Sequence, residues 1–325
     1  MLPVHPLTTI LVVALACALA APAGAADPFP TKPIELIVPT PPGGGTDITA
    51  RLLAEVAEPF LGQKVVVVNK PGGSGSVGIS LLTRARPDGY TLAFVWNAPL
   101  TIVPHTLDVG YTLDALTPIS QSTGGTPLIF CAKPDFPAKD GKEFLEHLRQ
   151  NPDRYTYGND GVGATVQLAG ERVFRAVGAK VRPVPFGGAG ETLKAFLGGH
   201  VDIYGGSIPP VVGHVKDGKM KCLLATAVER NPALPGTTSL GELGLGAKAS
   251  DLWRGVIGPK GLPADRVAFL EKAFRQAAQT PKFREALVAR GEQGIGSTAG
   301  EFRTLIATEF AEHDEIIQGL GLKKK

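Results

Sequence analysis

The stretch that decides the fold runs from Pro39 to Asp47 and reads Pro-Thr-Pro-Pro-Gly-Gly-Gly-Thr-Asp. It follows a short apolar run, Ile34–Val38, that is typical of a buried strand. Apolar residues then recur at helical spacing, at Ile48, Leu52, Leu53, Val56 and Phe60. Glycines let backbone N–H groups approach a ligand, and the first N–H groups of a helix favour negative charge. The stretch therefore predicts an anion-binding loop whose ligand is a carboxylate or a phosphate.

The length, hydrophobic content and net charge of the chain indicate a globular protein. The chain has 325 residues, 43% of them hydrophobic, which is enough for one or two globular domains. Its formal net charge is only +3, and no stretch interleaves Lys and Arg with aromatic residues. We therefore expect no nucleic-acid binding.

The first 26 residues are typical of a signal peptide. Thr9–Ala20 is almost wholly apolar, and small residues precede Asp27, so cleavage near Ala26 is expected. No Lys or Arg precedes the apolar run, which leaves a retained membrane anchor, or a lipoprotein joined through Cys17, as less favoured alternatives. The segment predicts export, and we expect a periplasmic protein.

Two cysteines, Cys131 and Cys222, remain after this cleavage, and both lie in strand-like apolar runs. An oxidising compartment would permit a disulfide between them. Two separate buried thiols are the simpler interpretation, and the sequence leaves both possibilities open.

Strand and helix patterns alternate along most of the chain, which predicts an α/β architecture with a largely parallel sheet. The region between Trp96 and Leu128 reads as irregular, and the last 60 residues read as helical. A second glycine-containing loop, Gly158–Thr165, also follows a strand and opens a helix. One such loop is an ordinary turn more often than a site, but two of them suit two α/β lobes that face one cleft.

The sequence contains no complete motif of the common enzyme classes. Gly73–Gly78 matches the letters of a dinucleotide fingerprint, but Asn69-Lys70-Pro71 separates it from its strand and no acidic residue lies at the required offset. No Walker lysine and no G-x-S-x-G elbow is present, and the histidines lack metal-ligand spacing. We expect no catalytic residue, no metal site and no cofactor.

Several motifs together resemble one family, the Bug-type (TctC-like) receptors of tripartite tricarboxylate transporters. They are Pro33–Asp47, Val68–Gly75, Pro87–Leu92, Phe186–Gly190, Gly198–Asp202, Gly218–Ala225 and Leu234–Gly244. The resemblance covers about residues 28–320 in order. It implies a two-lobed periplasmic-binding-protein-like fold, in which each lobe is a mostly parallel sheet flanked by helices. It also implies that residues 27–126 and 252–325 form lobe 1, and that residues 127–251 form lobe 2.

The resemblance further implies function. Such a receptor captures a small organic carboxylate between its lobes and delivers it to multi-span membrane transporter subunits or to a sensor, and we expect a monomer. The implied ligand-binding residues are Gly43, Gly44, Gly45, Thr46, Asp47, Gly73, Ser74, Gly75, Trp96, Asn97, Gly161, Val162, Gly163, Ala164, Thr165, Phe186, Gly187, Gly188 and Asp202. Two helix N-termini, each meeting one carboxylate, would suit a dicarboxylate.

Some residues depart from the family pattern. Trp96-Asn97 stands where small residues are usual, and Trp96 either offers a flat face to an aromatic carboxylate or packs at the lobe edge. Asp160, before the second loop, would repel an anion unless it points away or orients water. Two other functions stay open, an exported α/β enzyme acting on a carboxylate and a scavenging protein without a transporter.

Overall fold

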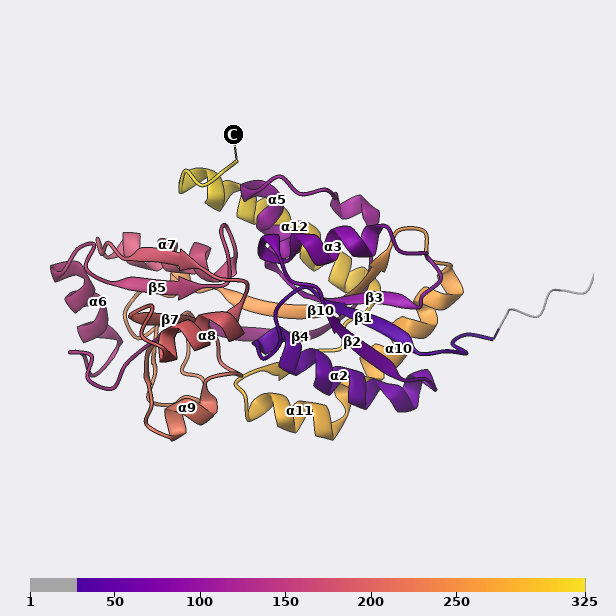
Figure 1. Cartoon of the computed structure of the whole chain (residues 1–325), viewed down its shortest axis with the longest axis horizontal. Helices are drawn as coiled ribbons and strands as arrows, with labels where there is room; N and C mark the ends of the chain where they lie inside the picture. Colours follow the sequence, from indigo (N-terminus) through magenta and orange to yellow (C-terminus); the bar gives the residue numbers. More distant parts are fainter. Residues whose placement is uncertain (1–27, 325) are drawn as a thin grey trace, which may run out of the picture.

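The computed structural model describes residues 28–324. The predicted signal peptide, residues 1–26, lies outside the described residues. Among the residues that are described, no helix is long and apolar enough to cross a bilayer. Figure 1 shows two groups of strands and helices lying side by side, with two long strands, β4 and β10, running between them.

The first group contains three parallel strands in the order β2-β1-β3. Their bounds are β1 Ile34–Val38, β2 Val65–Asn69 and β3 Thr91–Trp96. Its helices are α2 Gly45–Leu61, α3 Ser76–Thr83, α10 Ala264–Gln279 and α11 Pro281–Val288. The short helices α4 Ala98–Thr101 and α5 Val103–Thr106 and the long helix α12 Ala299–Gly319 lie nearby. Apolar faces of β1, α2, α10 and α11 form one core.

The second group is also built from parallel pairs, β5 with β6, β5 with β7, and β8 with β9. Its strands are β5 Thr156–Asn159, β6 Arg182–Pro185, β7 Ile203–Ser207, β8 Lys221–Ala225 and β9 Thr238–Ser239. Its helices are α6 Gly141–Gln150, α7 Thr165–Ala176, α8 Ala189–Leu197 and α9 Val212–Lys216.

The two crossing strands are β4, Leu116–Ala132, and β10, Asp251–Pro259, and they pair antiparallel with each other. β4 pairs with β10 as far as Pro127 and with β7 from Leu128 onward. Each lobe is therefore parallel among its own strands and antiparallel to the crossing strands. This is a two-lobed α/β fold, as the sequence predicts. We use lobe 1 for residues 28–126 with 252–324, and lobe 2 for residues 127–251.

The long strand β4 was not predicted over its first half, Leu116–Pro127, which reads as irregular. Two prolines and Gly124-Gly125 interrupt its apolar pattern, and register shifts against β10 show that the pairing is bulged there. The predicted strand Ile34–Val38 coincides with β1, and the predicted helix after the glycine loop is α2, which begins at Gly45.

Cys131 and Cys222 form a disulfide. The simpler sequence interpretation, two separate thiols, is therefore wrong. The strands β4 and β8 place the two residues directly opposite each other in an antiparallel pair, which brings their side chains together on one face. The bond therefore lies within lobe 2, where it links β4 to β8.

The C-terminal end of α12 leaves lobe 1 and packs on lobe 2. Ile317 is fully buried in the core that contains Phe130, Tyr157 and Phe174 of lobe 2. Arg175 of α7 donates a hydrogen bond from Nη1 to the backbone oxygen of Leu320, at 2.9 Å. The lobes are thus connected by β4, by β10 and by this helix end.

Candidate functional site

Two helix N-termini from different lobes meet at the centre of the molecule. α2 of lobe 1 begins after Gly44, and α8 of lobe 2 begins after Gly188. They are so close that a Cβ on Gly190 would lie 2.9 Å from the backbone nitrogen of Gly44. Because real Cβ atoms do not approach so closely, glycine is required for this contact. The positive ends of both helix dipoles point at the same small space.

The first N–H groups of α2 and α8 carry no side-chain cap. The nearby carboxylates bind the preceding loops instead. Asp47 accepts a hydrogen bond at Oδ2 from the backbone nitrogen of Gly43, at 2.9 Å, and Glu191 accepts one from Gly187, also at 2.9 Å. The helix N–H donors themselves therefore remain free for a ligand.

Arg254 brings a full positive charge to the same space. It lies on β10 and is only 1% exposed, and its Nε donates to Thr46 Oγ1 at 3.2 Å. Its Nη1 forms an ion pair with Glu292, which is also buried and accepts a hydrogen bond from Thr49 Oγ1 at 2.8 Å. Glu292 satisfies one edge of the guanidinium, and Nη2 lies 2.7 Å from where a Cβ on Gly45 would be. A carboxylate at this position would meet Arg254 and α2 together.

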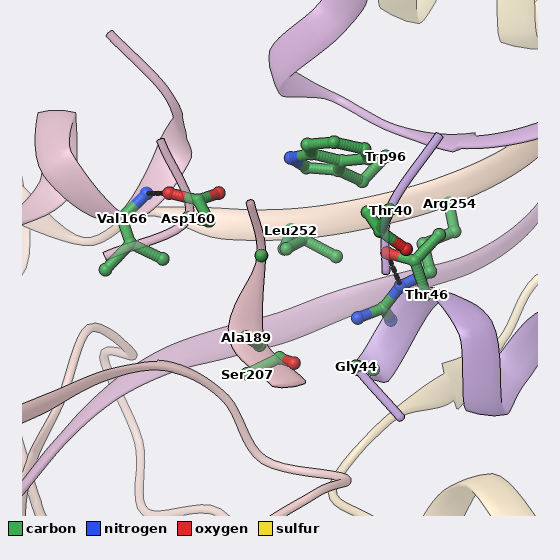
Figure 2. Close-up of a pocket in the computed structure, with 12 residues that line it drawn as sticks. Thr40, Gly44, Thr46, Trp96, Asp160, Val166, Ala189, Ser207, Leu252 and Arg254 are labelled. Atoms are coloured by element: carbon green, nitrogen blue, oxygen red, sulfur yellow. Dashed lines mark hydrogen bonds between the residues drawn. The ribbon is translucent and has the colours of Figure 1, made fainter. Parts of the chain in front are cut away.

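Asp160 lies across the pocket from Arg254 (Figure 2). It follows β5 and is buried, and its Oδ1 accepts a hydrogen bond from the backbone nitrogen of Val166 at 2.9 Å. Burial raises the pKa of its carboxyl to about 6, although hydrogen bonds from the Val166 backbone and the Trp96 side chain act in the opposite direction. Val166 is in the first turn of α7, so the N-terminus of α7 already holds a carboxylate of the chain itself.

The pocket between these groups is small. It is lined by Thr40, Gly44, Gly45, Thr46, Trp96, Asp160, Val166, Gly188, Ala189, Ser207, Leu252 and Arg254. The cavity measures about 30 Å³, which is room for about two water molecules. Trp96 is 2% exposed, and its indole ring both lines this pocket and belongs to a buried apolar cluster. The two lobes therefore leave little free space between them at the site.

The structure brings five of the sequence-predicted ligand residues to the pocket. They are Gly44, Gly45, Thr46, Trp96 and Gly188. Gly43 and Asp47 lie just behind it. Asp47 is engaged by Gly43, Asn69 and an ion pair with Arg51 at 2.9 Å. Burial raises the pKa of Asp47, but these hydrogen bonds outweigh it and bring the pKa below the usual value. Asp47 therefore braces the glycine loop and is not free to contact a ligand.

A second set of predicted residues forms contacts between the lobes beside the pocket. Ser74 Oγ donates to the backbone oxygen of Val162 at 2.9 Å, and Thr165 Oγ1 donates to Asn97 Oδ1, also at 2.9 Å. The residues in or next to these contacts are Gly73, Ser74, Gly75, Asn97, Gly161, Val162, Gly163, Ala164 and Thr165. Residues 161–165 of the second glycine-containing loop thus pack against lobe 1, whereas the uncapped N-terminus of α8 faces the pocket.

The remaining predicted ligand residues do not line the pocket. Phe186 packs over Gly158, and Gly187 lies against Pro41 at the rim. Asp202 is exposed at the opposite end of β7 from Ser207, and it accepts hydrogen bonds from the backbone nitrogen and the hydroxyl of Thr156, at 2.8 and 2.7 Å. We therefore remove Asp202 from the candidate site.

Sequence reasoning missed Arg254 and did not include Asp160 among the ligand residues. The signal for Arg254 was a lone arginine inside an apolar strand, Leu252–Ile257, because a buried arginine must have a partner. Its partner Glu292 is remote in sequence, which hides the pair. Ala189 follows Gly188 directly and could have been added to the predicted set. Within residues 28–324, no group of three His, Cys, Asp or Glu side chains is placed to hold a metal ion.

Comparisons with known proteins agree with this architecture. A family model described as "Tripartite tricarboxylate transporter family receptor" matches residues 49–322. A UPF0065 protein of Bordetella pertussis is 31% identical over 310 residues, covering 95% of this chain and 96% of that protein. The structure of the periplasmic binding protein BugD is similar with a TM-score of 0.85 and 29% identity, covering 91% of this chain and 100% of BugD. MatC from Rhodopseudomonas palustris with bound malate gives a TM-score of 0.81 and 26% identity, covering 89% and 100% of the two chains.

Proposed function

Because this chain belongs to the tripartite tricarboxylate transporter receptor family, the Bug-type (TctC-like) receptors, we propose that it is a periplasmic receptor that captures a small organic carboxylate between its two lobes. The receptor then presents the closed form to the membrane subunits of a transporter, or to a sensor. The observation that carries this proposal is the meeting of the α2 and α8 N-termini with Arg254 in one buried pocket.

These groups supply what a carboxylate needs. The uncapped N–H groups of α2 and α8 donate hydrogen bonds, and the guanidinium of Arg254 adds a charged donor. Each helix terminus contributes about 0.3–2 kcal/mol toward an anion. The hydroxyl of Ser207 lies on the lobe 2 side of the same space, so both lobes contact the bound group.

Ligand capture requires the lobes to separate and to close again. The cavity of about 30 Å³ is too small for a molecule the size of malate, so the ligand-bound form must be somewhat more open than this structure. The contacts that hold the lobes together beside the pocket are few hydrogen bonds, such as Ser74 to Val162 and Thr165 to Asn97. Each is worth about 0.5–1.5 kcal/mol, which a ligand can replace during closure.

The test is thermal and chemical unfolding of the chain from Asp27 onward with a panel of organic acids. The panel contains di- and tricarboxylates, amino acids and aromatic carboxylates, with the corresponding neutral amides as controls. A ligand at 100 times its Kd should add about 2.7 kcal/mol to the free energy of unfolding. Stabilisation by acids and not by their amides is the expected result. Equal effects of acids and amides, or no effect of any acid, would contradict the proposal.

A further inference from the structure

The pocket has two ends of opposite electrical character (Figure 2). At one end lie Arg254 and the N-termini of α2 and α8, all of which favour negative charge. At the other end lies the carboxyl group of Asp160, beside the nitrogen edge of the Trp96 indole. A symmetric anion would experience these two ends very differently.

The Asp160 carboxylate has no cationic partner within the described residues. None of the ion pairs in this part of the chain includes it, and its hydrogen bonds come from neutral N–H groups such as that of Val166. Two buried phenols lie close enough to feel its charge, but the hydroxyl of Tyr204 donates to the backbone of Ser207 and that of Tyr157 to the backbone of Gln167. The charge of Asp160 is therefore left facing the pocket.

Asp160 also occupies a position that a second ligand carboxylate would need. Its Oδ1 binds the first turn of α7, the third helix whose N-terminus points toward the site. Similarly, Gln167 Oε1 accepts a hydrogen bond from the backbone nitrogen of Gly163, at 2.6 Å. These two donors of α7 and of its loop are thus satisfied by the chain itself, which favours one carboxylate subsite over two.

From this arrangement we infer that the ligand carries one carboxylate and one ammonium group, and that Asp160 is the residue that selects for the ammonium. This inference rests on the proposed function and specifies its ligand class. The ligand carboxylate binds at Arg254 and the N-termini of α2 and α8. The ammonium group pairs with Asp160 and contacts the face of Trp96, since an indole ring attracts a cation. A dicarboxylate would place a second negative charge against the buried carboxylate of Asp160, which is unfavourable.

Calorimetric titration of the chain from Asp27 onward with matched ligand pairs tests the inference. In each pair an ammonium or aminomethyl group replaces one carboxylate: alanine with methylmalonate, 4-aminobutanoate with succinate, and 5-aminopentanoate with glutarate. At pH 7.5 we expect the ammonium ligand of at least one pair to bind ten times more tightly than its diacid, or better. In Asp160→Asn, which keeps an acceptor for the Val166 N–H, that preference should fall at least tenfold. Asp202→Asn, the same change at an exposed site of lobe 2, should keep it.

The outcomes separate the two proposals. Tight binding of diacids without ammonium acids would overturn the inference and leave the carboxylate receptor standing. An unchanged preference in Asp160→Asn would show that the ammonium is selected elsewhere, which also overturns it. Binding of neither class by the wild-type chain would overturn both the inference and the proposed function.

Discussion

The buried pair of Arg254 and Glu292 is expected to stabilise the fold only as a pair. Their side chains are 1% and 0% exposed, and each has one further neutral partner, Thr46 for Arg254 and Thr49 for Glu292. In Arg254→Met the carboxylate of Glu292 stays buried with one hydroxyl donor, and in Glu292→Gln the guanidinium loses its counter-charge. Breaking such a pair costs about 3–5 kcal/mol, whereas replacing both charges is close to neutral.

A double-mutant cycle measures the coupling energy between Arg254 and Glu292. If each single variant loses about 3–5 kcal/mol and the double variant Arg254→Met/Glu292→Gln loses about 2 kcal/mol or less, the coupling energy is at least about 4 kcal/mol. Urea unfolding followed by circular dichroism measures each free energy by linear extrapolation. The exposed pair Arg149 and Glu146, with Nη2 and Oε1 2.8 Å apart, is the matched control, and the same substitutions there should leave stability unchanged.

The double variant also distinguishes the role of Arg254 in stability from its role in ligand binding. The double variant should fold almost as stably as the wild-type chain, yet it should bind carboxylates more weakly because the pocket has lost its guanidinium. A double variant as unstable as the sum of the two single variants would refute the reasoning, because the charges would then not be coupled. A stable double variant with unchanged ligand affinity would confine Arg254 to a structural role.

Three other changes have outcomes that the structure specifies. Burial raises the pKa of Asp160 from 3.8 to about 6, so the free energy of unfolding of the wild-type chain, relative to that of Asp160→Asn, should fall by up to about 3 kcal/mol as the pH rises from about 4 to 7. Urea unfolding of both proteins at pH 4 and pH 7 measures this change. A difference in unfolding free energy between the two proteins that is the same at both pH values would contradict the prediction. Replacing Cys131 and Cys222 by alanine should lower the free energy of unfolding by about 2–4 kcal/mol, and a dithiol reductant should then have no further effect on the melting temperature. Gly45→Ala would place a Cβ 2.3 Å from Ser207 Oγ in the opposite lobe, so we expect calorimetry to show at least tenfold weaker ligand binding. In the control variant Gly213→Ala the new Cβ would meet open space, and ligand affinity should stay the same.

The local elements could be predicted because they depend on residues close in sequence. The run Ile34–Val38, the glycine loop and the apolar spacing after it were enough to place β1 and the start of α2. The first half of β4 was missed because its pairing with β10 comes from a segment more than a hundred residues away, and prolines and glycines hide its pattern. The disulfide was left open for the same reason, since only the register of β4 against β8 brings Cys131 to Cys222.

The site was predictable in part. Glycines signal close backbone approach, which is why the predicted residues include Gly44, Gly45 and Gly188, all of which line the pocket. Sequence gives no direction for a side chain, however, so it could not show that Asp47 turns back onto its own loop while Asp160 faces the pocket. It also could not pair Arg254 with Glu292, because that contact depends on how the segment after α11 packs against β10 in the finished fold.

The pairing of β4 with β10 limits how the two halves of this receptor can move. The two strands are hydrogen-bonded to each other over most of the length that they share in lobe 1, so they bend as one ribbon and resist sliding past each other. The end of α12, which packs on lobe 2, connects the two halves at a further point. If the lobes close on a ligand by bending these two strands together, the angle at which the closure stops would depend on the length of that ligand.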